Sequence, residues 1–154
     1  MRLSKKSDYA LRALVMLAKK NGGGPVSNRE LAVANDIPSG FLQQIMLELK
    51  ECGWVSSIPG RDGGYVLAVA PDALSMGQVV RRFDGVLAPI GCVSITHYEP
   101  CSQEARCSFR RVLLGVRNHT ARQLDQTTLA ELVLGRPALN EEVFAPEFID
   151  GAGI

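Results

Sequence analysis

A short helix, a tight turn and a longer helix follow one another near the N-terminus, and this succession constrains the fold more than any other feature. Ser27 and Glu30 have the spacing of a capping box, so a helix begins here and ends near Asn35. The turn at residues 36–39 leads into a second helix over residues 40–52, followed directly by a glycine that closes it. This arrangement is typical of helix-turn-helix proteins that bind DNA.

The longer helix is amphipathic and presents a polar surface at its N-terminal end. Its apolar face consists of Leu42, Ile45, Met46 and Leu49. The opposite surface carries Ser39, Gln43 and Gln44, and a glutamine amide can bond an adenine edge in the major groove. We therefore predict that these three residues contact DNA, although without the surrounding motif the same glutamines fit any solvent-exposed helix.

A glycine-rich hairpin is expected directly after the longer helix. Residues 54–58 and 65–69 have strand character, and the intervening Pro-Gly-Arg-Asp-Gly-Gly segment permits the backbone angles of a tight turn. This hairpin completes a winged helix-turn-helix, so the predicted fold class is mainly α with a small β-wing. Arg61 at the wing tip is expected to enter a minor groove, with a solvated turn residue as the alternative.

The charge is divided unevenly along the chain. Residues 1–70 carry nine Lys or Arg against six Asp or Glu, whereas residues 71–154 carry eight against ten. The basic half is therefore the candidate for contact with DNA phosphates. Within it we expect Arg2, Lys5 and Lys6 to contact phosphates, with solubility as the alternative role.

The N-terminal segment is predicted to be an amphipathic helix over residues 4–20 and not an export signal. Asp8 and Arg12 interrupt its apolar run, and no stretch is long enough to span a membrane. Four cysteines at irregular spacing, with no leader, point to a reducing compartment. A cytoplasmic protein is therefore expected.

Beyond the wing, the sequence predicts a short helix over residues 75–83, an irregular loop, and a long helix from about residue 108. An apolar stripe on the long helix, which could pack within one chain or form a dimer seam, consists of Phe109, Val112, Leu113 and Val116. We divide the chain into a winged helix-turn-helix domain (1–83), a cysteine-bearing loop (84–107), dimerisation helices (108–134) and a poorly ordered tail (135–154).

Three of the four cysteines, Cys92, Cys101 and Cys107, lie close together in the sequence. Thiolates are soft donors suited to iron-sulfur clusters and to zinc. Zinc with a further ligand such as His97 is an alternative to a cluster, and scattered reactive thiols are another. Cys52 is interpreted as a small buried apolar residue. No nucleophile turn or phosphate-binding loop is recognisable, so an enzyme is not expected.

The chain resembles the Rrf2 family of bacterial regulators over residues 1–134. The resemblance rests on the opening residues 1–4, the Tyr-Ala-Leu-Arg register at 9–12, the wing ending at 63–65 and the three cysteines. It implies a homodimer with paired long helices that binds a pseudo-palindromic operator in double-stranded DNA. It also implies a [2Fe-2S] or [4Fe-4S] cluster beside the dimer interface.

The cysteine region departs from the family pattern in two respects. The branch that controls iron-sulfur biogenesis has a histidine three residues after its last cysteine, and Arg110 occupies that position here. The two gaps between cysteines are eight and five residues, where the biogenesis and nitric-oxide branches usually have five in both. By resemblance to the nitric-oxide branch, Asp8 of the partner protomer is the expected fourth ligand.

These observations predict a transcriptional repressor whose operator affinity is controlled by an iron-sulfur cluster. The signal is iron, nitric oxide or redox state, among which the sequence does not choose. The alternative is a regulatory protein-interaction module that lacks a cluster or binds zinc, and whose cysteines are redox-active.

Overall fold

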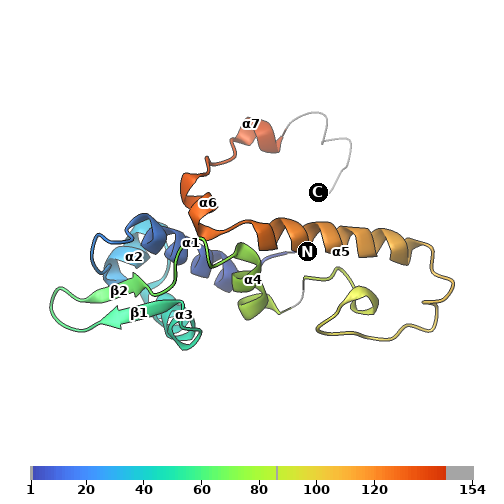
Figure 1. Cartoon of the computed structure of the whole chain (residues 1–154), viewed down its shortest axis with the longest axis horizontal. Coiled ribbons are helices and arrows are strands. Elements are labelled where there is room, and N and C mark those ends of the chain that lie inside the picture. The colour runs from blue at the N-terminus through green and yellow to red at the C-terminus, as the bar shows by residue number, and fades with distance from the viewer. Residues whose placement is uncertain (1, 86, 145–154) are drawn as a thin grey trace.

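The computed structural model describes residues 2–85 and 87–144, and its N-terminal half is organised around helix α1 (Lys5–Lys19) (Figure 1). Ser4 begins this helix by accepting a hydrogen bond from the Ser7 N–H. Ala10, Leu14 and Leu17 recur at helical spacing and are buried. Helices α2, α3, α4 and α6 and strand β2 all contact α1. The small alanine on this face allows close approach of its neighbours.

Helices α2 (Asn28–Asn35) and α3 (Ser39–Glu51) form the predicted helix-turn-helix. Ser27 caps α2 by accepting a bond from the Glu30 N–H. The turn depends on Asp36, whose φ of 53° lies in the left-handed region that aspartate tolerates better than most side chains. The Ile37 N–H then donates to the Ala32 carbonyl, so the turn is closed by backbone bonds.

Strands β1 (Val55–Ile58) and β2 (Gly64–Leu67) pair antiparallel, with Val55 opposite Leu67. Each is one residue shorter than predicted. Tyr65 also pairs with Val26, which attaches the wing to the segment before α2. Gly64 permits this contact, because a Cβ there would lie 2.3 Å from the Val26 carbonyl oxygen. The mainly helical fold with a β-wing confirms the predicted fold class.

The C-terminal half is a series of helices joined by an irregular segment. Helix α4 (Met76–Asp84) begins with the predicted capping box, and the loop that follows contains the 3₁₀ turn η1 (Gly91–Val93), which the sequence did not predict. Helix α5 (Phe109–Gln126) extends away from the winged helix (Figure 1). A second capping box separates it from α6 (Leu129–Leu134).

The predicted poorly ordered tail is described in part. A single helical turn, α7 (Asn140–Val143), lies within it, because Glu142 accepts a hydrogen bond from the Leu139 N–H at 2.8 Å. Residues 145–154 lie outside the described residues. Among the residues that the structure describes, no helix combines the length and apolar character needed to cross a lipid bilayer.

An ion pair joins α4 to the end of α5. Arg81 donates hydrogen bonds to both carboxylate oxygens of Asp125, one of them at 2.7 Å. These bonds hold the pKa of Asp125 below its usual range. Gly77 lies directly beneath the carboxylate, and a Cβ at this position would collide with Asp125. The pair therefore joins the first turns of α4 to the C-terminal end of α5.

This geometry predicts a pH-dependent contribution to stability. A carboxylate whose pKa is lowered in the folded state contributes its full stabilisation when the pH is above its unfolded-state pKa of about 3.9. This contribution is lost as the pH falls through the lowered, folded-state pKa. Both side chains are more than a third exposed, at 37% and 44%, so we expect Asp125→Asn to cost less than about 1 kcal/mol near pH 7. Urea unfolding from about pH 7 to about pH 3 measures the difference, which should shrink as the pH falls toward the lowered pKa. Asp72→Asn, on an exposed turn, is the control; an equal loss at all pH values would contradict the assignment.

Candidate DNA-binding surface and thiol cavity

The first turns of α3 expose the polar side chains predicted to contact DNA. Ser39, Gln43 and Gln44 are exposed, whereas Leu42 and Ile45 on the other face are completely buried. A helix whose buried face is fixed in this way presents its opposite N-terminal surface at a constant orientation. This is the part of a recognition helix that meets base edges in the major groove.

Asn28 connects the beginning of α2 to the beginning of α3. Its side-chain amide donates to the Ser39 hydroxyl oxygen at 3.0 Å and to the Ser39 carbonyl at 3.4 Å. Because the hydroxyl oxygen already accepts a bond, the hydroxyl proton of Ser39 is free to donate to a phosphate or base. The carbonyl oxygen of the Asn28 side chain is buried without a partner among the described residues.

Basic residues of α1 lie beside the beginning of α3. Tyr9 packs edge-on against Phe41, with the ring centres 5.8 Å apart. The Lys5 ammonium and the Arg12 guanidinium each lie 5.8 Å from the Tyr9 ring centre. Lys5 is exposed, with only a long ion pair of 4.0 Å to Asp8. Lys6 differs from the expectation, because its charge is paired with Glu48 of α3 at 2.5 Å.

The wing carries Arg61 at its tip, between β1 and β2, where the side chain is exposed. The wing is attached to the end of α3, because the Trp54 N–H donates to the Leu49 carbonyl at 3.1 Å and Trp54 leads directly into β1. A positive side chain on a projecting hairpin is well suited to a groove or to phosphates.

The three clustered cysteines line one cavity of about 370 Å³ at the N-terminal end of α5. Cys92 is buried in η1, Cys101 is exposed in the loop, and Cys107 is half-buried just before α5. All three thiols are free. Within residues 2–85 and 87–144, no three Cys, His, Asp or Glu side chains converge closely enough to hold a metal ion. The three thiols line this one cavity, and thiolates are donors suited to iron-sulfur clusters and to zinc.

Arg110 occupies the position where a histidine ligand was sought, and it contacts the loop backbone instead. Its guanidinium donates to the Cys92 carbonyl at 2.8 Å and 3.2 Å and pairs with Glu104 at 3.1 Å. Glu104 also accepts bonds from the Tyr98 hydroxyl and the Cys101 N–H. The Tyr98 bond, the Cys101 bond and the Arg110 charge together lower the pKa of Glu104.

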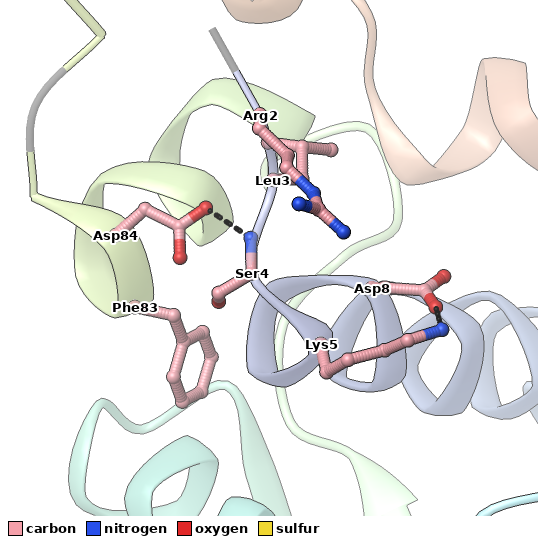
Figure 2. Close-up of a pocket in the computed structure, with 7 residues that line it drawn as sticks. All are labelled: Arg2, Leu3, Ser4, Lys5, Asp8, Phe83 and Asp84. Atoms are coloured by element: carbon pink, nitrogen blue, oxygen red, sulfur yellow. Dashed lines mark hydrogen bonds and ion pairs between the residues drawn. The ribbon is translucent and has the colours of Figure 1, made fainter.

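Asp8 lies in a separate surface pocket of about 810 Å³ at the beginning of α1 (Figure 2). Arg12 donates to its two carboxylate oxygens at 2.8 Å and 2.9 Å. The same pocket contains Arg2, and the Ser4 N–H bonds the Asp84 carboxylate at 3.1 Å, as Figure 2 shows. None of the three clustered cysteines lines this pocket.

The remaining candidate ligands lie away from the thiol cavity. The ring of His97 contacts the Thr96 hydroxyl at 3.3 Å, and His119 is exposed on α5. Cys52 was interpreted as a buried apolar residue, but it is only half-buried and its sulfur accepts a bond from Arg82 at 3.0 Å. This contact joins the end of α3 to α4.

An exposed recognition helix beside a β-wing defines a winged helix-turn-helix protein. Residues 3–135 match the Rrf2 family, which is described as an iron-dependent transcriptional regulator. Among curated relatives, an Rrf2-like regulator of Rhodobacter capsulatus is 38% identical over 88% of this chain and 95% of its own length. CymR of Bacillus subtilis is 34% identical, and the match covers 86% of this chain and 89% of CymR. NsrR of Bacillus licheniformis is 29% identical, and the match covers 88% of this chain and 94% of NsrR. The chain belongs to the Rrf2 family of transcriptional regulators, which confirms the resemblance.

Solved structures agree with this assignment. CymR of B. subtilis, described as the global cysteine regulator, has a TM-score of 0.77 and 32% identity, covering 89% of this chain and 99% of its own. IscR of T. potens has a TM-score of 0.69 and 26% identity, covering 87% of each chain. The relatives are transcriptional regulators, and this confirms that the chain is not an enzyme.

Sequence reasoning missed two residues that organise these sites. Asn28 was given no role of its own, although asparagine at the first position of one helix can reach the next helix across a tight turn. Nothing in the sequence indicated a role for Glu104, because its partners Tyr98, Cys101 and Arg110 follow no regular spacing along the chain. Arg110 was recognised only as a missing histidine.

For the DNA-binding surface, we predict that Gln43→Ala weakens binding to the cognate operator by about 1 to 3 kcal/mol and leaves non-specific binding nearly unchanged. Arg61→Ala should reduce the salt dependence of binding if Arg61 meets phosphate, or relax the preference for A/T pairs if it enters a minor groove. Titration of labelled operator at two salt concentrations measures both effects. Gln126→Ala, at the far end of α5, is the matched control. Wild-type operator affinity in both variants would refute this mode of docking.

Proposed function

We propose that the protein is a cytoplasmic, homodimeric repressor whose operator affinity is controlled by an iron-sulfur cluster bound to Cys92, Cys101 and Cys107. The observation that carries this proposal is that three free thiols from separate turns line one cavity next to α5. Thiolates are the usual ligands of such clusters. Membership of a family described as iron-dependent supports the same cofactor.

In the proposed complex with a pseudo-palindromic operator, the DNA contacts are Arg2, Lys5, Ser39, Gln43, Gln44 and Arg61. The glutamines would read base edges, since they lie on the exposed side of α3. The basic side chains would contact phosphates or a groove. A homodimer matches this symmetry by presenting two recognition helices to two half-sites.

The fourth ligand in this proposal is Asp8 of the partner protomer. Arg12 engages both of its carboxylate oxygens within one chain, so ligation requires that this pair open. Three thiolates with one exchangeable oxygen ligand would leave an iron exposed to loss or to attack by a small molecule, which is the property that a sensor needs. Whether [2Fe-2S] or [4Fe-4S], the cluster would use the same three thiols.

The dimer proposal rests on the exposed surface of α5. No residue of α5, which is described from end to end, is buried, although the helix has 18 residues. Phe109, Val112 and Val116 are 62%, 65% and 48% exposed, and Leu113 is half-buried. A contiguous apolar stripe of this kind on a long helix is suited to pairing with a second copy about a two-fold axis.

We therefore predict that Val116→Glu produces monomers with weak operator binding, because it places a charge in the seam between two copies of α5. Light scattering at micromolar concentration measures the change in mass. Val33→Glu is the control for oligomeric state, since Val33 is 76% exposed on α2. A wild-type protein that is monomeric under these conditions would disprove the dimer.

The cluster itself is tested by anaerobic purification followed by iron, sulfide and absorption analysis. We expect a coloured protein, and we expect Cys92→Ala, Cys101→Ala and Cys107→Ala each to abolish the chromophore. Cys52→Ala should retain it, because Cys52 contacts Arg82 away from the cavity. A colourless wild-type protein with stoichiometric zinc would contradict the cluster.

A second candidate is a thiol-based regulator that lacks a cluster or binds zinc, acting through interactions with another protein. It is favoured by the fact that, in the part of the chain described here, the thiols do not converge on a metal position. The similarity to CymR, a cysteine regulator by description, points the same way. A colourless protein whose operator affinity changes on thiol oxidation would support this candidate over the first.

A further inference from the structure

We propose that Arg110 and Glu104 are positioning residues that assemble the three thiols of the cavity before any cofactor binds. The inference rests on the proposed function for the identity of the cofactor, but not for the arrangement of the apoprotein. Its basis is a network in which one arginine and one glutamate hold the backbone of two cysteines against the helix that follows the third.

Arg110 fixes the position of Cys92. The Nε and Nη2 atoms of Arg110 both donate to the Cys92 carbonyl, at 3.2 Å and 2.8 Å. A guanidinium presents these two donors in a rigid plane, so the direction of the carbonyl is set as well as its distance. Cys92 is only 8% exposed, and its carbonyl direction determines how the residue enters the cavity.

Glu104 fixes the position of Cys101. Its Oε1 atom accepts a bond from the Cys101 N–H at 3.1 Å, and both oxygens accept from the Tyr98 hydroxyl at 2.8 Å. The Oε2 atom pairs with the Nη2 atom of Arg110 at 3.1 Å. The segments that carry Cys92 and Cys101 are therefore joined through two side chains.

The third cysteine is placed by the chain itself. Cys107 lies three residues before Arg110, at the junction with α5, and it lines the same cavity as Cys92 and Cys101. About two turns beyond Arg110 on α5, Arg117 donates to the Val93 carbonyl at 2.8 Å. Two arginines of α5 thus hold the two adjacent carbonyls of η1, which resists rotation of this turn.

Arg110 has a second effect through its charge. A cluster with three thiolate ligands is negatively charged, and a nearby cation stabilises the reduced form more than the oxidised form. Net charge and hydrogen bonds near a cluster are known to set its potential. The histidine of the biogenesis branch would supply a ligand at this position. Arg110 instead holds the Cys92 carbonyl by two hydrogen bonds and adds a positive charge.

The test distinguishes two contributions of Arg110, the paired hydrogen bonds of its planar guanidinium and its positive charge. The variants are Arg110→Gln, which removes both, Arg110→Lys, which keeps the charge alone, and Glu104→Gln. Arg122→Gln on the exposed side of α5 is the matched control. The first measurement is the alkylation rate of each thiol in the reduced apoprotein, with Cys52 as the internal reference. Circular dichroism establishes that every variant is folded.

We expect Cys92 to be alkylated about tenfold faster or more in Arg110→Gln and Arg110→Lys, as the loss of a charge-assisted hydrogen bond predicts. Glu104→Gln should accelerate Cys101 most strongly. In the reconstituted protein, Arg110→Gln should shift the midpoint potential to a more negative value, while Arg110→Lys should keep the wild-type potential. Alkylation rates equal to those of Arg122→Gln would overturn the proposal, as would an unchanged potential in Arg110→Gln.

The outcomes also separate this inference from the proposed function. If the wild-type protein binds no iron, the proposed cofactor is wrong, and the alkylation rates alone decide whether Arg110 and Glu104 position the thiols. If the wild-type protein is coloured and all variants alkylate as it does, the cofactor stands and the positioning role is wrong.

Discussion

Burial of one face of α1 is the interaction on which the rest of the structure depends. Ala10, Ala13 and Leu14 are fully buried, and α2, α3, α4 and α6 are positioned by contact with this helix. The small side chains allow close packing, and Leu14 fills the space between the neighbouring helices. The orientation of the recognition helix α3 is therefore a consequence of the same core that positions α4. The two helices also contact each other directly, because Arg82 of α4 bonds Cys52 and pairs with Glu51 at the end of α3.

Helix α5 has no fully buried residue, and it is positioned within the protomer by polar bonds and by partly buried Ala121 and Leu124, which pack against the core. At its C-terminal end the Met76 N–H donates to the Thr127 carbonyl at 2.8 Å, and Arg81 pairs with Asp125. At the other end, arginines hold the turn that carries Cys92. Helix α5 therefore connects the turn that carries Cys92 with α4. From α4 the contact between Arg82 and Cys52 leads to the end of α3.

The elements that depend on local sequence were predictable, and those that depend on distant contacts were not. The capping serines Ser27 and Ser75 and the glycine-rich wing each have a short-range physical cause, so they identified the winged helix-turn-helix, although Glu30 pairs with Lys20 and does not complete the box predicted at Ser27. The break between α5 and α6 has a similar signal in Thr128 and Glu131, which was overlooked within a long helical pattern. The residue types of the thiol site could be read from the sequence. Their organisation by Glu104 and Arg110 could not, because it arises when an irregular loop folds back on α5.

We propose above all that the state of the thiol cavity controls the affinity of α3 and the wing for DNA. A ligand shifts such an equilibrium only by as much as its affinity differs between the two states. The most direct measurement is an operator titration under strict anaerobiosis, comparing the iron-loaded protein with the same preparation after the iron is removed by chelation. The account predicts clearly different dissociation constants for the two forms, with the dimer intact in both. Equal dissociation constants would contradict it.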